Sequence, residues 1–183
     1  LIDWGVHFLD IVMYCCGDPL PLTVSGETFS VLGKQMQDYV YLSMWAGPPK
    51  YDGIYDVEDS VTGMIRTYDT HKQKSGPVIT LNGAWAQNIG KDEMFIDFMG
   101  DKAGIRLKYG DNFMLYGSKD GALIEYSPRY NSEDPFKQEI NAFINSVKTG
   151  VKQSSHIDTA IITARMMQAL YDSADSHREV ELK

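Results

Sequence analysis

The sequence predicts an α+β fold in which an open, predominantly antiparallel β-sheet has helices packed on one of its faces. Two observations predict this class. In the middle of the chain, segments of strand length follow one another and are separated by turn residues. At both ends of the chain, apolar residues recur at helical spacing. Strands joined by tight turns pair antiparallel, and helices that are grouped apart from the strands pack on one sheet face.

The elements are predicted in the following order. A helix begins almost directly at Leu1 and is stopped by Gly17, Asp18 and Pro19. A strand over residues 22–32 follows, and the chain then forms a long loop that extends through GPPKYDGIYDVED, residues 47–59. Loops of this length are often functional. The next strands are predicted over residues 60–68, 77–87, 93–100, 104–109, 112–117 and 122–127.

Two helices and a last strand complete the chain. The first helix is predicted from Pro135 to Thr149, and the second carries an apolar face from Ile157 to Ala174 with Ser154 or Ser155 as its cap. The segment REVEL, residues 178–182, is predicted to be the closing strand.

Length and composition limit the possible functions. The 183 residues suit one domain, residues 1–183. The net charge of −8 and the lack of a basic cluster argue against nucleic acid or a membrane surface as partner. No apolar run is long enough to span a bilayer and no signal peptide is visible, so a soluble, cytoplasmic protein is expected. The adjacent Cys15 and Cys16 lack a zinc-ligand pattern, and no metal is expected.

The central strands contain more apolar residues than one covered sheet face requires. We therefore expect the opposite face to be buried against another subunit or domain. The apolar residues concerned are Phe95, Phe98, Ile105, Leu107, Phe113, Leu115 and Tyr116.

A polar stripe interrupts the otherwise apolar first helix. Asp3, His7, Asp10 and Tyr14 are spaced by four, three and four residues, so they share one helix face. A carboxylate one turn before a histidine can orient the ring and stabilise the imidazolium, as a general acid or base requires. Three alternatives remain open: Asp3 is only the helix N-cap, His7 and Asp10 are a hydrogen-bonded core pair, or the stripe binds a metal.

The motifs along the chain resemble one known family in their order. DWGVHFLD resembles the D-x-G-x-H-x-x-D signature of the glucose-fructose oxidoreductase, inositol dehydrogenase and rhizopine-catabolism (Gfo/Idh/MocA) family. VEDSVTGMIRTYD, GAWAQ and FIDFMGDKAGIRL resemble its sheet motifs. DPFKQEINAFINSVKTG and ARMMQALYDSADSHREVEL resemble its C-terminal helices and last strand. In this family a glycine usually follows the last helix, so His177 is expected to adopt a left-handed conformation there.

The resemblance covers only the C-terminal domain of that family, which is built on an open sheet like that of dihydrodipicolinate reductase. The G-x-G-x-x-G turn and the E-K-P motif of the N-terminal Rossmann domain are absent from this sequence. The resemblance therefore implies a substrate-binding and oligomerisation domain, inactive alone, from an enzyme that transfers hydride between a sugar or polyol and nicotinamide. NAD or NADP would be held by the enzyme's own Rossmann domain, and the enzyme would form a homo-oligomer, dimer or tetramer, through the sheet face. The alternatives are a free-standing binding or assembly module and an NAD-dependent glycosidase of the same family.

The resemblance also implies roles for individual residues. His7 would exchange a proton with the substrate oxygen, and Asp3 would be its partner. Five residues are implied in substrate binding: Trp4, Trp85, Gln87, Asn88 and Lys91. Structural explanations exist for some of these as well, since Trp85 suits a core position and Lys91 suits a solvated turn.

Overall fold

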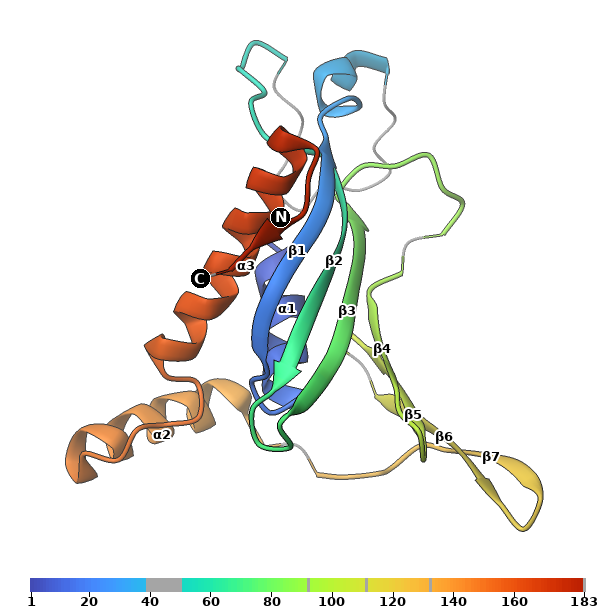
Figure 1. Ribbon diagram of the computed structural model, residues 1–183, viewed down its shortest axis with the longest axis vertical. Coiled ribbons are helices and arrows are strands. Elements are labelled where there is room, and N and C mark those ends of the chain that lie inside the picture. Colours follow the sequence, from blue (N-terminus) through green and yellow to red (C-terminus); the bar gives the residue numbers. More distant parts are fainter. Residues whose placement is uncertain (39–50, 92, 111, 132, 183) are drawn as a thin grey trace. The chain divides into compact units, whose positions relative to one another are not determined.

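The computed structural model confirms the α+β class (Figure 1). It describes residues 1–38, 51–91, 93–110, 112–131 and 133–182, so residues 47–50 of the predicted functional loop lie outside the described residues. The chain divides into two compact units, the first comprising Leu1–Asn88 and Ile157–Lys183 and the second Ile89–His156.

The described strands form two four-stranded antiparallel sheets, ordered β3-β2-β1-β8 and β4-β5-β6-β7, whereas the sequence predicted one open sheet. Turn residues join β2 to β3 and each pair of neighbouring strands in the second sheet, which are hairpins, whereas β1 pairs with β2 across a long segment and with β8 near the other end of the sequence. The segment between β3 and β4 is not a hairpin turn, and no local signal in it specifies pairing.

The first unit holds two long helices, one sheet and a short 3-10 helix. Its elements are α1 (Gly5–Cys15), β1 (Leu20–Phe29), η1 (Gly33–Asp38), β2 (Ser60–Asp69), β3 (Lys74–Ala84), α3 (Ile157–Ser176) and β8 (Val180–Glu181). The predicted stop of α1 is present, because Gly17 has a φ of 77° and the Asp18 amide donates to the Met13 carbonyl at 2.8 Å. β1 ends at Phe29 and β3 at Ala84, which is earlier than predicted for both strands.

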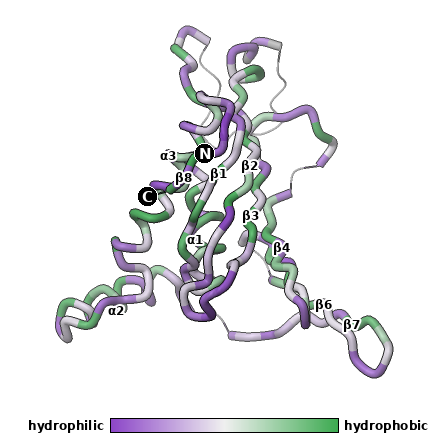
Figure 2. The backbone as a smooth tube through the Cα atoms, viewed as in Figure 1, coloured by the Kyte–Doolittle hydropathy of each residue, from purple (hydrophilic) through white to green (hydrophobic). Residues whose placement is uncertain are grey.

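The hydrophobic core lies between the sheet of the first unit and its two long helices. Val24 pairs with Ile65, and Ile65 pairs with Ile79, so these three buried side chains share one sheet face. Leu9 of α1 and Leu170 of α3 belong to the same buried cluster. Both helices therefore cover this face, as predicted, and α1 is hydrophobic over most of its length (Figure 2).

The close packing of α3 on the sheet depends on a glycine. A Cβ atom on Gly26 would lie 2.9 Å from Cγ of Leu170 and 2.8 Å from the Thr62 carbonyl oxygen. The Gly26 amide also donates to Oγ of Ser173 at 3.0 Å, which ties β1 to the C-terminal half of α3. Only glycine permits this approach of helix to sheet.

The ends of α3 differ in part from the prediction. The helix begins at Ile157, so His156 and not Ser154 or Ser155 occupies the N-cap position. An apolar face that starts at Ile157 fixes the first helical residue, and both serines lie before the position that caps it. At the other end His177 has a φ of 51°, which confirms the left-handed conformation predicted after the helix.

The second unit consists of β4 (Phe95–Met99), β5 (Gly104–Lys108), β6 (Phe113–Lys119), β7 (Ala122–Tyr126) and α2 (Pro135–Thr149). Asp120 and Gly121 both have positive φ, 53° and 79°, which is the conformation of a two-residue type I′ hairpin between β6 and β7. α2 has the predicted bounds, because the Asp134 carboxylate caps its first turn and Gly150 ends it with a φ of 70°. None of the described helices is both long and apolar enough to cross a bilayer.

Candidate functional site

The polar stripe lies on the exposed side of α1. Asp3, in the turn before the helix, is exposed, and so are His7 and Asp10, whereas Leu9 and Met13 are buried against the core. The spacing therefore predicted the shared face correctly. Within the first unit, α1 is covered on one side only, and the His7 side chain is exposed on the other side.

The structure distinguishes between the three alternatives for the stripe. The N-cap residue of α1 is Trp4, and no side chain caps the helix, so Asp3 is not the cap. Asp10 accepts a long hydrogen bond of 3.5 Å from the hydroxyl of the buried Thr163, and this contact ties α1 to α3. Neither Asp3 nor the His7 ring has a hydrogen-bonded partner among the described residues. Within the same part of the chain, no group of His, Cys, Asp or Glu side chains could hold a metal ion.

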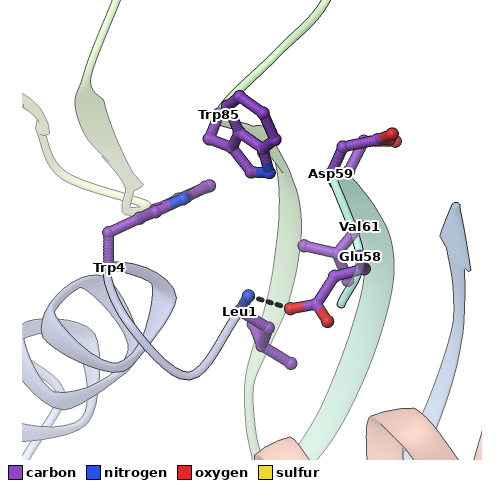
Figure 3. A pocket seen from close by; sticks show the side chains of 8 residues that line it. Leu1, Trp4, Glu58, Asp59, Val61 and Trp85 are labelled. Carbon is purple, nitrogen blue, oxygen red and sulfur yellow. Dashed lines mark hydrogen bonds and ion pairs between the residues drawn. The ribbon is translucent and has the colours of Figure 1, made fainter. Parts of the chain in front are cut away.

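A shallow, open pocket lies beside the start of α1 in the first unit (Figure 3). It is lined by Leu1, Trp4, Glu58, Asp59, Ser60, Val61, Gly83 and Trp85. The ring of Trp4 packs directly on β3, since a Cβ atom on Gly83 would lie 1.8 Å from the ring. The pocket has room for about one water molecule, so it does not enclose a ligand by itself.

Glu58 is one of the two acidic residues that line this pocket. Its carboxylate accepts a hydrogen bond at 2.8 Å from the hydroxyl of Tyr171. Burial, with the Glu58 carboxylate beside the phenol, raises the pKa of Tyr171.

Asp59 is buried, and its hydrogen bonds connect the ends of three strands beside the pocket. One of its carboxylate oxygens accepts from the amides of Val31 at 2.6 Å and Gly33 at 2.9 Å. Its backbone amide donates to the Phe29 carbonyl, and its backbone carbonyl accepts from the amide of Trp85 at 3.1 Å. The ends of β1, β2 and β3 are thus joined at one residue.

The structure brings together two of the five residues implied in substrate binding. Trp4 and Trp85 both line the pocket, and the 40% exposure of Trp85 shows that it is not a core residue. Gln87 and Asn88 follow on an exposed segment outside the pocket lining. Lys91 belongs to the second unit, where it pairs with Glu93 on the surface. The solvated-turn explanation therefore fits Lys91.

Tyr55 and Glu58 lie in the long loop that the sequence predicted to be functional, although neither was singled out there, and Tyr171 was missed. Glu58 and Asp59 form the acidic pair that opens the VEDSVTGMIRTYD segment, and this pair just before a strand was the available signal. Tyr171 meets Glu58 only through the tertiary fold, and its local sequence carries no signal for this contact.

Comparison with known proteins places the chain among oxidoreductases. Residues 1–182 match the family described as "Oxidoreductase family, C-terminal alpha/beta domain". A D-glucoside 3-dehydrogenase of Escherichia coli K12 is 30% identical over 184 residues, which cover 100% of this chain and 48% of that protein. The chain thus spans about half the length of this curated relative.

Solved structures show the same fold. A levoglucosan dehydrogenase in complex with NADH and L-sorbose has a TM-score of 0.71 at 16% identity, over 99% of this chain and 49% of that chain. An aldose-aldose oxidoreductase from Caulobacter crescentus complexed with glycerol has a TM-score of 0.68 at 15% identity, over 97% of this chain and 46% of that chain.

Proposed function

Because the chain belongs to the Gfo/Idh/MocA oxidoreductase family, we propose that it is the substrate-binding and oligomerisation part of a longer NAD(P)-dependent dehydrogenase acting on a sugar or polyol. We refer to that longer protein as the full-length enzyme. Oxidation of a CH–OH group removes a hydride from carbon and a proton from oxygen. The nicotinamide accepts the hydride when bound, and the residues of this chain handle the proton.

The observation that carries this proposal is the position of His7 on the accessible side of α1. The His7 amide donates to the carbonyl of Trp4 at 3.2 Å, so His7 lies one turn beyond a residue of the pocket wall. A sugar held against Trp4 would present its hydroxyl groups to this side of the helix. His7 would take the hydroxyl proton during oxidation and return it during reduction, and Asp3 would stabilise the protonated ring.

The nicotinamide would be bound outside this chain. A dinucleotide site needs a glycine-rich turn between a parallel strand and a helix N-terminus. All strand pairs among the described residues are antiparallel, and the pocket is too small for a dinucleotide. The residues of this chain therefore do not fit the whole cofactor. The unpaired thiols of Cys15 and Cys16 suit a reducing compartment such as the cytoplasm.

The sheet of the second unit is the proposed oligomerisation surface. Its register places six apolar side chains on one face, which we call the apolar sheet face: Ile96, Phe98, Ile105, Leu107, Phe113 and Leu115. Each of them is only half-buried. A contiguous apolar surface of this kind is typical of an interface with a second copy of the protein.

Turnover by the full-length enzyme tests the proposal. Sugars and polyols are supplied with NAD or NADP, and reduced nicotinamide is followed by its absorbance. We expect reduction with at least one sugar or polyol. In calorimetric titration, the full-length enzyme binds a nicotinamide cofactor, whereas the 183-residue chain alone binds neither NAD nor NADP. Micromolar binding of NAD or NADP to the chain alone would contradict the proposal that the cofactor is bound outside this chain.

A further inference from the structure

Trp85 forms a wall of the pocket and is not a core residue. It follows the last residue of β3 and is 40% exposed. Its backbone amide is fixed by the Asp59 carbonyl, yet this bond does not determine the direction of the indole ring. The ring needs a second anchor if it is to present a fixed surface to a ligand.

Tyr55 supplies that anchor. The indole Nε1 of Trp85 donates to the Tyr55 hydroxyl at 2.9 Å, and the two ring centroids lie 5.9 Å apart at an angle of 48°. The hydrogen bond and the ring contact together restrict rotation of the indole about its side-chain bonds.

Tyr55 is itself held by the backbone at Gly33. A Cβ atom on Gly33 would lie 2.0 Å from Cζ of Tyr55, so the tyrosine ring occupies the space that any other residue would fill. The Gly33 amide is in turn bound by the Asp59 carboxylate, which is only 3% exposed. The buried Asp59 thus holds the backbone of Gly33, Gly33 leaves room for the Tyr55 ring, and Tyr55 holds the Trp85 indole.

We propose that Tyr55 is a positioning residue that fixes Trp85 as a stacking wall for a cyclic carbohydrate. The proposal rests on the proposed function and narrows its substrate class from sugars and polyols to ring-closed pyranosides. The partial negative charge on an indole face attracts the C–H groups of a sugar ring, and the contact removes apolar surface of both partners from water.

A ring-closed substrate suits such a wall better than an open-chain polyol. A pyranoside with mostly equatorial hydroxyl groups has a preformed face of C–H groups. An acyclic polyol would lose conformational freedom on forming the same face, and that loss offsets the contact energy. Trp4, fixed on Gly83 at the other side of the pocket, provides a second aromatic surface.

The test measures ligand binding separately from turnover. The full-length enzyme is labelled with 5-fluorotryptophan, the Trp85 fluorine signal is assigned with Trp85→Phe, and methyl β-D-glucopyranoside or D-glucitol is titrated. We expect the pyranoside to shift the Trp85 signal and D-glucitol to leave it unchanged at the same concentrations. Tyr55→Phe removes the hydroxyl group that accepts the indole hydrogen bond and should weaken pyranoside binding by roughly threefold to tenfold. Tyr51→Phe, the same change on an exposed tyrosine outside the pocket, should bind as the wild type does.

A second variant covers the case in which Tyr55→Phe does not fold. Gly33→Ala places a methyl group where the Tyr55 ring lies, and it should weaken pyranoside binding in the same way. Wild-type affinity in the folded Tyr55→Phe or Gly33→Ala variant would overturn the positioning role, and equal affinity for D-glucitol would overturn the substrate class. If the wild-type enzyme reduces no nicotinamide with any sugar but the pyranoside still titrates Trp85, the proposed function fails while this inference holds.

Discussion

Asp3 is exposed next to α1, and its side chain does not cap the helix. Trp4 holds the N-cap position, and no described residue pairs with the Asp3 carboxylate. Asp3→Asn should therefore leave the melting temperature of the full-length enzyme unchanged and lower kcat by about tenfold or more, because an amide does not stabilise an imidazolium. Steady-state kinetics and thermal unfolding check both parts. Wild-type kcat in this variant would remove Asp3 from the proton-transfer site.

His177 is a titratable residue away from the site whose behaviour the structure predicts. Its Nδ1 lies 2.9 Å from the Glu27 carboxylate, and this hydrogen bond raises the pKa of His177 above its ordinary value. A histidine with a raised pKa in the folded state stabilises that state below the unfolded pKa of about 6.5. The stabilisation is lost as the pH rises through the folded-state pKa.

An NMR pH titration of the His177 ring measures this effect directly. Glu27→Gln should return the His177 pKa toward its ordinary value, and Asp18→Asn, a carboxyl-to-amide control outside this ion pair, should leave it raised. An equally raised pKa in Glu27→Gln would show that Glu27 is not the cause.

At the scale of elements, the contact of α3 with β1 depends on the absence of a side chain at Gly26. Gly26→Ala should lower the free energy of unfolding by about 1–3 kcal/mol, because the new methyl group meets both the Thr62 carbonyl and Leu170. Gly53→Ala is the matched control, since a Cβ atom there would meet nothing within 4 Å. Urea unfolding of both variants gives the comparison. Equal stability of the two variants would contradict the packing described here.

The elements that the sequence predicted best are those with local signals at both ends. α2 has its predicted bounds because Asp134, Pro135 and Gly150 act within a few residues of the helix termini. β3 was predicted to continue to residue 87, since Trp85 and Ala86 prolong the apolar pattern. The strand ends at Ala84 because the next amide bonds to Asp59, which is distant in sequence.

The same distinction holds for the candidate site. The spacing of Asp3, His7 and Asp10 within one helix predicted their shared exposed face. The pocket walls come from three separate parts of the first unit, so spacing could not predict that Trp4, Glu58 and Trp85 lie together. Their assembly depends on the pairing of β2 with β3 and on the packing of Trp4 against Gly83.

At the scale of the whole molecule, the apolar sheet face predicts self-association. The full-length enzyme should be a dimer or tetramer by light scattering. Ile105→Glu, near the centre of the face, should reduce the mass toward that of a monomer, because an interface cannot bury an unpaired carboxylate. Glu125→Gln, at an exposed position of β7 outside this face, is the control and should keep the oligomer. A monomeric wild-type enzyme at tens of micromolar would show that some other part of the protein covers this face.

The claim that unites these features is that this chain supplies the proton-transferring residue of a two-part dehydrogenase. The most direct measurement is kcat of the full-length His7→Ala enzyme with a sugar that the wild type oxidises. The imidazole is exposed and packs nothing essential, so folding and cofactor affinity should be unchanged while kcat falls by roughly 10²–10⁴. A folded His7→Ala enzyme that binds its cofactor and retains wild-type kcat would contradict the claim.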